Sequence, residues 1–420
     1  GNWNQSVPKN PKLATMLHLY RILASTMAFA VLLSGRPHVV SAFSKLGRMN
    51  ANTSTASSAT RLGVSSVLED MGRTFQKAFA STESTNSAYY TVGITGSSGL
   101  LGSALIDELG KQASVNGKPL RIVKLQRSED VEGTELSDSS LTSAPWNPKG
   151  ASANAVIDPS VIESMDCVVH LAGENVATGS GPLGFLGIRA WSDDKKAEIL
   201  NSRVGPTKAL ATAIKASKTP TTFLTASGVG VYGSDFIGES KAAADESTDA
   251  SNAGGFLADV SRQWEAASED AGNNRVVNCR MGVVMSRKGG ALAKLFPVFF
   301  LGGGGILSSG NQYFSFISAR DGARALAYAL STPSIKGPVN ICAPQPCTNA
   351  EFTSALGKVL SRPTILPFPG FAVSLLFGEM GDEMLSGGVR AVPTKLQKSG
   401  FEFQHPTILE ALQSAMDEEI

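Results

Sequence analysis

The sequence is poor in cysteine, and its cysteines follow no cross-linking or metal-binding pattern. The four cysteines, Cys167, Cys279, Cys342 and Cys347, are too few and too scattered for a disulfide scaffold. No Cys-x-x-Cys pair and no histidine cluster has the spacing of a zinc site. We therefore expect reduced thiols and no bound metal.

A strong charge of either sign is also missing. Charged residues make up 17% of the chain, the formal net charge is +1, and there is no long basic run. Nucleic acids and anionic membrane surfaces attract chains with an excess of Lys and Arg. We therefore expect a small-molecule substrate and no nucleic-acid partner.

The apolar stretch near the amino terminus, residues 22–33, is too short to cross a bilayer, which takes about 20 residues. It suits the core of a signal peptide, and small residues at 40–43 suit a cleavage site. We expect the start at Met16, a signal peptide over residues 16–42, and no integral membrane span in the mature chain. Plain secretion, a mitochondrial leader and a membrane anchor are the alternatives.

The next segment has the composition of a transit peptide. Residues 44–68 are rich in Ser, Thr and Ala, carry Lys45, Arg48 and Arg61, and contain no acidic residue. A signal peptide followed by a transit-like segment, here residues 43–88, resembles the bipartite presequence of algae with secondary plastids. We therefore expect a leader over residues 1–88 and import into the plastid (chloroplast).

A glycine-rich run is the most informative motif. Residues 91–95 read as a short buried strand, residues 96–102 are Gly-Ser-Ser-Gly-Leu-Leu-Gly, and apolar residues then recur at helical spacing. A glycine turn that joins a strand to a helix start directs backbone N–H groups and the positive helix end at one point, which suits a pyrophosphate. The spacing differs from Gly-x-Gly-x-x-Gly, and a glycine turn without a ligand is the alternative. We expect a dinucleotide site.

Strand and helix patterns alternate after Tyr90. The expected strands are residues 92–95, 121–126, 167–172, 222–227, 276–281 and 339–342, and the clearest helices are 195–217 and 257–271. Apolar strands that alternate with helices predict an α/β fold with a parallel sheet covered on both faces. Such sheets bind ligands at the carboxyl ends of their strands. Residues 128–158 are polar, contain Pro145 and Pro148, and are expected to form a loop.

The end of the second expected strand bears on the choice of cofactor. An acidic residue there grips the ribose hydroxyls of NAD, whereas an arginine can pair with the extra phosphate of NADP. This strand ends in Gln126 and Arg127, and Glu129 and Asp130 follow only later. We expect NADP in preference to NAD; an Arg127 that is merely a solvated charge is the alternative.

Several spaced motifs carry a family resemblance. Residues 166–173, Asp-Cys-Val-Val-His-Leu-Ala-Gly, resemble the fourth-strand segment of the extended short-chain dehydrogenase/reductases. Residues 172–175, 191–203, 230–233, 264–265, 280–284 and 301–305 follow in the order seen in one atypical subgroup. That subgroup belongs to the NAD(P)-dependent epimerase/dehydratase family and is often labelled nucleoside-diphosphate-sugar epimerase or cell-division-inhibitor-like. His170, within the first motif, is expected to be a core histidine rather than a catalyst.

The resemblance implies a Rossmann-type doubly wound parallel sheet over residues 89–343 and a smaller carboxyl-terminal α/β module on the substrate side, residues 344–420. It implies that the pyrophosphate lies against Gly96, Ser98, Gly99, Leu100, Leu101 and Gly102. Gln126 and Arg127 would hold the adenosine ribose phosphate, and Leu171 and Ala172 would line the adenine and ribose. Glu198 and Arg203 would reach the cofactor from the side, and Val284 would contact the nicotinamide end. An ordinary solvated helix face is the alternative for the Glu198 and Arg203 pair.

The catalytic pair of this superfamily is missing. Active members use Tyr-x-x-x-Lys, in which the lysine lowers the tyrosine pKa for proton transfer. None of the six tyrosines is followed four residues later by lysine, and Leu257 and Ser261 stand at the expected positions. Ser227 or Tyr232 remain as candidates that could polarise a carbonyl.

The carboxyl-terminal half contributes two further expectations. By the resemblance, the glycine-rich loop 302–305 and Asp321 border a substrate cavity. The apolar segment 368–377 could cover that cavity or touch a membrane, and simple core packing is the reading we favour. A peripheral membrane or protein partner stays open.

Two functions remain after these observations. We expect an NADP-binding, epimerase-like oxidoreductase of the plastid that lacks Tyr-x-x-x-Lys. The alternative is a catalytically inactive dinucleotide-binding regulator or assembly factor, for example in plastid division. A structural membrane-associated subunit is a third reading.

Overall fold

The computed structural model describes residues 88–127, 140–150, 153–176, 191–236, 242–366 and 368–418, all of which belong to one compact unit, residues 83–420. The expected leader, with its signal and transit segments, lies outside the described residues apart from position 88. No helix among the described segments is long and apolar enough to cross a membrane.

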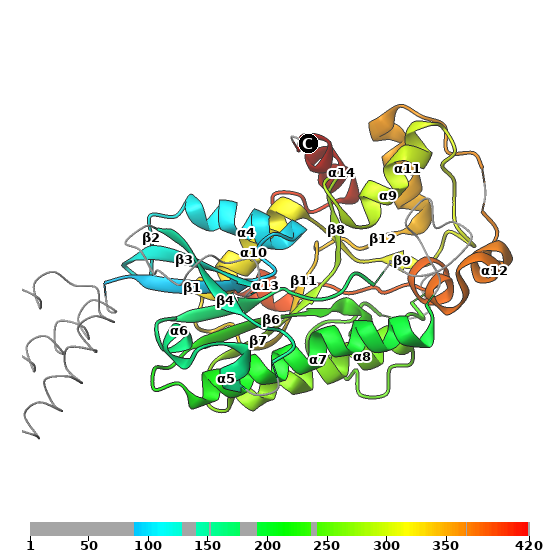
Figure 1. Ribbon diagram of the computed structural model, residues 1–420. Helices are drawn as coiled ribbons and strands as arrows, with labels where there is room; N and C mark the ends of the chain where they lie inside the picture. Colours follow the sequence, from blue (N-terminus) through cyan, green and yellow to red (C-terminus); the bar gives the residue numbers. More distant parts are fainter. Residues whose placement is uncertain are drawn as a thin grey trace, which may run out of the picture. The chain divides into compact units, whose positions relative to one another are not determined.

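A mostly parallel sheet forms the centre of this unit (Figure 1). Its parallel strands are β1 (Tyr90–Thr95), β3 (Lys118–Arg127), β4 (Leu141–Trp146), β5 (Cys167–His170), β6 (Thr222–Gly228), β7 (Val276–Met281) and β11 (Gly337–Ile341). The order is β11-β7-β6-β5-β1-β3, with β4 beside β3 and the short β2 (Ser114–Val115) antiparallel to the start of β3. The chain therefore reverses its direction of winding next to β1, which is the switch point at which such sheets bind ligands.

Helices cover both faces of the sheet. On one face lie α4 (Leu100–Gly110) and α10 (Ala319–Ser331), whose Leu105 and Leu326 share a core with Ile94. On the other lie α5 (Ala153–Val156), α6 (Pro159–Glu163), α7 (Asp193–Ala216), α8 (Phe256–Ser268) and the short turn η5 (Glu269–Ala271) (Figure 1). Leu210 of α7 packs there against Phe223. The predicted doubly wound α/β fold is confirmed.

One expectation was wrong, because strand β4 (Leu141–Trp146) lies inside the segment predicted to be a loop. Thr142, Ala144 and Trp146 are buried in alternation and face the core under α7. Pro145, within this strand, suggested a chain break. Proline is tolerated here because β4 pairs only with β3 among the described strands, and an edge strand can spare a backbone N–H.

The remaining elements build a second region, with its own core. Strand β8 (Val283–Met285) pairs with β10 (Phe316–Ser318), and β9 (Tyr313–Phe314) pairs with β12 (Cys347–Thr348). Helices α9 (Gly290–Phe300), α11 (Asn349–Leu360) and α14 (Ile408–Met416) bury Leu292, Leu356 and Leu412 in a shared cluster. Capping boxes at Thr348 and Thr407 start α11 and α14.

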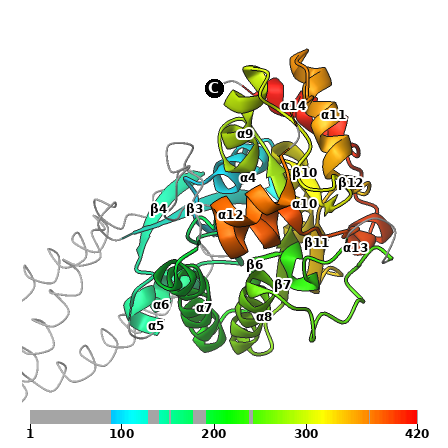
Figure 2. The same ribbon diagram turned by 90° about the vertical axis from the view of Figure 1, so that its right-hand side faces the viewer.

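A helical segment lies across the carboxyl ends of the central strands. It comprises α12 (Gly370–Gly381) and the π-helical turn η6 (Asp382–Ser386), and the short α13 (Thr394–Lys398) follows later. Figure 2 shows α12 in front of the sheet, between α7 and α8 below and α9, α11 and α14 above. Val373, Phe377 and Met380 form a small core there, while Phe371 and Leu375 are exposed. Part of this apolar segment thus packs as a core, as expected.

Candidate functional site

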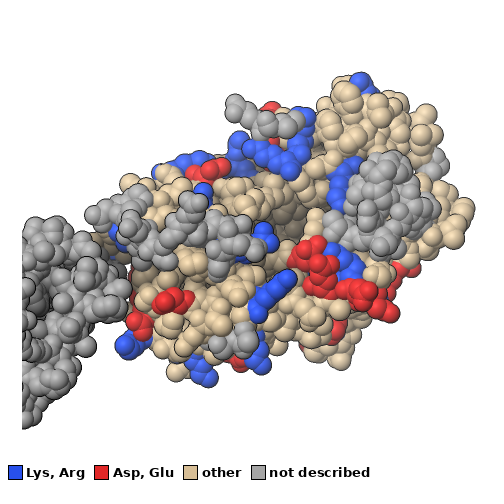
Figure 3. All heavy atoms as spheres, viewed as in Figure 1, with Lys and Arg blue, Asp and Glu red and all other residues tan. Residues whose placement is uncertain are grey.

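The glycine turn joins β1 to α4 as the sequence predicts. Gly96 has φ +67°, which favours glycine, and its carbonyl accepts a hydrogen bond of 2.9 Å from the Gly99 N–H. Gly99 is the N-cap of α4, and no side chain among the described residues caps the helix there. The first-turn N–H groups and the positive helix end are therefore available to an anion. Figure 3 shows a hollow in the molecular surface near the start of α4.

Two contacts show why these glycines are needed. A Cβ atom on Gly102 would lie 2.1 Å from the Gly96 carbonyl oxygen, and one on Gly96 would lie 2.9 Å from the Ala172 nitrogen. The turn therefore packs directly against the end of β5, at Leu171 and Ala172. Residues 76 positions apart are brought together at the switch point, as the family resemblance implies.

The other cofactor-binding candidates approach the turn from two sides. Gln126 and Arg127 end β3, the neighbour of β1, and the Arg127 side chain is exposed. Val284 lies on β8, which pairs with β10 outside the central sheet. A Cβ atom on Gly290 would lie 3.6 Å from the Val284 carbonyl oxygen and 4.0 Å from the Leu100 side chain, so β8 passes close to the start of α4.

Glu198 and Arg203 have different environments. The guanidinium of Arg203 donates to the carbonyl oxygens of Ile199 (3.0 Å) and Glu174 (2.8 Å) and lies over the Trp264 ring. Burial lowers the pKa of Arg203 to about 10, although Glu174 opposes this shift. The Glu198 carboxylate accepts from Lys195 at 3.0 Å and is 57% exposed. Arg203 therefore supports the backbone beside the site, whereas Glu198 faces outward.

Sequence reasoning missed the partners of Glu198. Lys195 also donates to Glu174, at 2.7 Å, and its side chain is only 11% exposed. Lys195 and Glu174 both stand inside motifs that carried the family resemblance. Nothing in the sequence, however, indicates that these two residues, 21 positions apart, form an ion pair. The low exposure of a lysine between two carboxylates is visible only in the structure.

His170 is the buried core histidine that the sequence analysis favoured. It is fully buried, its Nδ1 lies 2.7 Å from the Thr95 hydroxyl, and its ring packs against Trp146 and Phe223. Burial, with a smaller contribution from Arg203, lowers the pKa of His170 to about 3. It is therefore neutral at physiological pH and packs as part of the sheet.

The two catalytic candidates belong to one buried hydrogen-bond network. Ser227 donates its hydroxyl hydrogen to Glu265 at 2.8 Å, and both carboxylate oxygens of Glu265 accept from Arg280 at 2.8 Å. Arg280 donates onward to the hydroxyl of Tyr232 (2.9 Å), which donates to Asn340 (2.9 Å). Both hydroxyl hydrogens are therefore committed to protein partners.

The charges of this network are also fixed. Burial opposes the charge of Arg280, yet its hydrogen bonds to Glu265 raise its pKa overall. Burial raises the pKa of Tyr232 to about 12, although Arg280 opposes this shift. A tyrosine with so high a pKa is a poor proton-transfer group near neutral pH. The structure therefore gives Tyr232 the features of a structural residue.

Helix α8 presents Leu257 and Ser261 toward the end of β6. A Cβ on Gly230 would lie 3.4 Å from Leu257, and one on Gly228 would lie 3.6 Å from the Ser261 hydroxyl. The helix start is capped from a distant segment: the carboxylate of Glu383 accepts from the N–H groups of Phe256 (2.5 Å) and Leu257 (3.0 Å). The apolar Leu257 thus stands beside a carboxylate of η6.

Asp321, which the resemblance places beside a substrate cavity, is fully buried and has protein partners. It accepts hydrogen bonds from the N–H groups of Gln404 and His405 and from Arg324. Its role is to hold the segment before α14 against α10. The resemblance gave no information about these partners, because residues 404 and 405 lie far along the chain.

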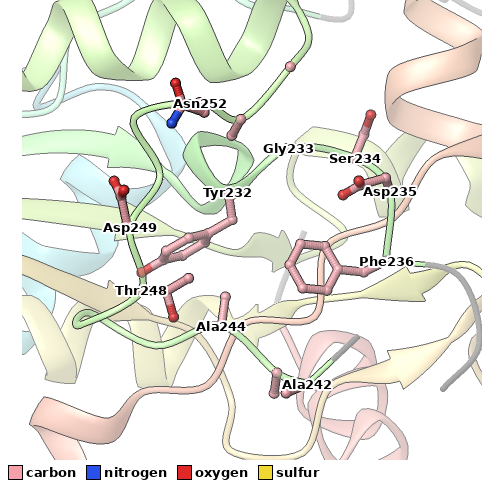
Figure 4. Close-up of a pocket in the computed structure, with 13 residues that line it drawn as sticks. Tyr232, Gly233, Ser234, Asp235, Phe236, Ala242, Ala244, Thr248, Asp249 and Asn252 are labelled. Atoms are coloured by element: carbon pink, nitrogen blue, oxygen red, sulfur yellow. The ribbon is translucent and has the colours of Figure 1, made fainter. Parts of the chain in front are cut away.

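A cavity of about 640 Å³ opens beyond the short 3₁₀ turn η3 (Val229–Tyr232). Its polar lining residues are Ser234, Asp235, Thr248, Asp249 and Asn252. Figure 4 shows Thr248, Asp249 and Ala244 near the ring of Tyr232, and Ser234, Asp235 and Phe236 together on the opposite side of the view. Among the described lining residues there is no Lys or Arg.

Metal and thiol chemistry find no support in the described segments. They contain no group of three or more His, Cys, Asp or Glu side chains placed to hold a metal ion. All four cysteines are free and buried, and burial raises the pKa of each thiol. Such thiols are poor nucleophiles.

Comparison with known proteins gives two family matches. Residues 92–342 match the NAD dependent epimerase/dehydratase family, and residues 368–415 match a domain of unknown function, DUF1731. The epimerase family protein Mb2239 of Mycobacterium bovis is 39% identical over 76% of this chain and 96% of its own length. The chloroplastic SDR39U1 homolog of Arabidopsis thaliana is 31% identical over 78% of this chain and 86% of its own.

The fold also matches solved structures of this kind. The crystal structure of human epimerase family protein SDR39U1 (isoform 2) with NADPH superposes with a TM-score of 0.62 at 28% identity, and covers 78% of this chain and all of the human one. The family expected from the motifs is confirmed: the chain belongs to the NAD dependent epimerase/dehydratase family.

Proposed function

We propose that this chain binds NADP(H) at the turn between β1 and α4 and acts as an epimerase-like oxidoreductase. The observation that carries the proposal is the turn itself, where a Cβ on Gly102 would collide with the Gly96 carbonyl at 2.1 Å and the helix start lacks a side-chain cap. Such a cradle fits a pyrophosphate held by backbone N–H groups. The human relative, whose structure contains NADPH, supports the choice of cofactor.

In this proposal each candidate residue has a role. Residues 96–102 hold the pyrophosphate, and the exposed Arg127, with Gln126, pairs with the ribose phosphate that distinguishes NADP from NAD. Leu171 and Ala172, beside the turn, would line the adenine and ribose. Glu198 and Arg203 of α7 would reach the cofactor from the side, and Val284 of β8 would contact the nicotinamide end. The cofactor would supply hydride transfer, and the protein supplies binding and orientation.

A second candidate is a dinucleotide-binding regulator or assembly factor without catalysis. The specific observation in its favour is that Ser227 and Tyr232 donate their hydrogens to Glu265 and Asn340. The resemblance adds that Leu257 and Ser261 would stand at the positions of the superfamily's catalytic pair. Cofactor binding is common to both candidates. They differ in whether the bound nicotinamide is turned over.

Two measurements test these candidates on the full chain. Calorimetric titration with NADP and with NAD should show tighter binding of NADP, and Arg127→Ala should weaken NADP far more than NAD. Equal losses for both cofactors would remove the preference for NADP. A metabolite screen for NADPH oxidation then separates the candidates, since tight binding without turnover on a broad screen favours the regulator.

We also propose that the chain acts in the plastid. The leader composition supports this location, and one relative is described as chloroplastic. The amino terminus of the protein purified from isolated plastids should lie beyond Phe43, near Ser87. Recovery of the protein outside plastids, or with Met16 still attached, would contradict the proposal.

A further inference from the structure

The segment formed by α12 and η6, residues 370–386, lies across the carboxyl ends of the central strands. Figure 2 shows α12 in front of the sheet at this edge. Parallel sheets of this kind bind their ligands outside the carboxyl ends of their strands. The α12–η6 segment therefore stands over the edge at which the proposed cofactor and a substrate would bind.

This segment packs largely on itself. All but one of the described members of its small core come from residues 368–385: Phe368, Val373, Phe377, Met380, Met384 and Leu385. The exception is Trp191, which precedes α7. The larger cores of the central sheet and of the second region include no described residue of the segment. Little shared apolar surface therefore holds the segment to the rest of the molecule.

Polar contacts join the segment to the starts of two helices. Glu379 of α12 forms an ion pair with Lys196 of α7, and these side chains are 47% and 27% exposed. Water competes for an ion pair at such exposure, so each contact of this kind is weak. The Glu383 carboxylate accepts hydrogen bonds from the first N–H groups of α8, those of Phe256 and Leu257. These contacts can break and re-form without disrupting a large core.

The Glu383 contact lies close to the expected chemistry. By the resemblance, Leu257 would stand at the position of the superfamily's catalytic tyrosine. The Leu257 N–H donates to Glu383 at 3.0 Å, so η6 lies beside this position. Movement of the segment would therefore uncover the start of α8 at the substrate side of the site.

The segment is anchored on both sides. Just before it, the Phe368 N–H donates to the Ile306 carbonyl oxygen at 2.9 Å, and just after it, the Gly388 N–H donates to the Ser234 carbonyl oxygen at 2.7 Å. Within it, Gly378 has φ +54° and ψ −143°, which interrupts the helical backbone of α12. Fixed ends allow the segment between them to move as a unit through changes at a few backbone angles.

We propose that the α12–η6 segment is a lid over the substrate side of the cofactor site. The lid opens about its two anchors to admit ligands and closes over the bound cofactor. The ion pair of Lys196 and Glu379, together with the Glu383 cap on α8, holds it shut. This inference rests on the proposed NADP(H) function, because the cofactor is the ligand over which the lid closes.

A cysteine reporter distinguishes a lid from a permanently packed helix. Val373 is fully buried on α12, and Val373→Cys changes its size little. The native Cys167 and Cys279 are also buried, and they lie in the central sheet. In the full chain, a thiol reagent followed by peptide mass spectrometry should label the reporter at least about 100-fold faster than these two cysteines, because the lid opens without unfolding of the sheet.

Met380→Cys, elsewhere on α12 and also buried, is a second reporter in case the first substitution itself loosens the helix. Since the lid moves as a unit, this thiol should also be labelled at least about 100-fold faster than Cys167 and Cys279. A reporter labelled no faster than these two cysteines would show that α12 opens only when the whole chain unfolds. That result would overturn the inference.

The ion pair is tested in the chain with the Val373→Cys reporter. Glu379→Gln removes the partner of Lys196 and should accelerate labelling about fivefold. Glu108→Gln removes the pair with Lys111 on α4, away from the lid, and is the matched control that should leave the rate unchanged. Equal effects of the two substitutions would contradict a lid held by this ion pair.

Saturating NADP should slow labelling of the Val373→Cys reporter at least about fivefold, since the closed lid covers the bound cofactor. Calorimetric titration of the same variant shows whether NADP binds. Binding without a change in the labelling rate would overturn the inference. Absence of NADP binding by the unmodified chain would overturn the proposed function itself, which is a distinct result.

Discussion

Ser227 and Glu265 are joined by a hydrogen bond of 2.8 Å in which the serine hydroxyl donates to Oε1 of the carboxylate. The same oxygen accepts from Nε of Arg280, also at 2.8 Å. Ser227, one of the two candidates for polarising a substrate carbonyl, is thus hydrogen-bonded to the ion pair of Glu265 and Arg280. Polarising a substrate carbonyl would require the serine to give up this bond.

The Glu265 and Arg280 pair should be essential for stability. Their side chains are 14% and 9% exposed, so Glu265→Gln leaves a buried guanidinium charge without its counter-ion. We expect the free energy of unfolding in urea to fall by about 3 kcal/mol. Glu108→Gln removes the exposed pair with Lys111 and should cost less than about 1 kcal/mol. Losses of similar size in the two variants would contradict the structural role of the network.

His170 should make stability depend on pH. Its pKa in the folded chain is about 3, below its ordinary value of 6.5, because burial disfavours the charged ring. Between these values the unfolded chain binds a proton that the folded chain excludes. Above pH 6.5 the free energy of unfolding is therefore not reduced by His170. As the pH falls from 6.5 toward 3, the free energy of unfolding decreases with a slope approaching about 1.4 kcal/mol per pH unit.

Urea unfolding of the unmodified chain and of His170→Gln between pH 7 and 4 measures this slope. Carboxylates that titrate in the same range are common to both proteins, so the difference in slope reports on His170. We expect the variant to have the shallower dependence. Parallel curves would show that the histidine takes up its proton in the folded state.

The Glu383 carboxylate should stabilise the start of α8. Glu383→Gln removes a negative charge from the N–H groups of Phe256 and Leu257, and we expect a loss of about 1 kcal/mol. Hydrogen exchange of these two amides should accelerate. Asp382, one residue earlier, accepts a hydrogen bond from the Ser374 hydroxyl instead. The variant Asp382→Asn should therefore leave the exchange of the Phe256 and Leu257 amides unchanged. Equal acceleration in both variants would mean that η6 as a whole, rather than this cap, protects the helix.

Local signals in the sequence were enough to predict the glycine turn between β1 and α4 and the neighbouring strand β5. The turn at Gly96–Gly102 depends on neighbouring residues, since strand, glycine turn and helix follow one another directly. The strand at Cys167–His170 is a continuous apolar run, as expected of a buried parallel strand. For these elements, residues that are adjacent in the chain are enough to predict the local structure.

Long-range contacts were not predictable in the same way. Glu383 lies 127 residues from the helix it caps, and Lys195 pairs with Glu174, 21 residues earlier in the chain. The hydroxyl of Ser227 donates a hydrogen bond to Glu265. In the sequence Glu265 is only the residue after Trp264 in an expected helix, and nothing there indicates this partner. The packing of distant elements decides which residues become partners, and no periodicity in the sequence indicates these partners.

The central claim is that the turn between β1 and α4 holds NADP, and two glycines of α4 test it most directly. A Cβ on Gly102 would lie 2.1 Å from the Gly96 oxygen, whereas one on Gly110 would meet nothing within 4 Å. Calorimetric titration of the full chain should show that Gly102→Ala weakens NADP binding at least about tenfold and that Gly110→Ala leaves it unchanged. NADP binding of unaltered strength in the folded Gly102→Ala variant would contradict the account.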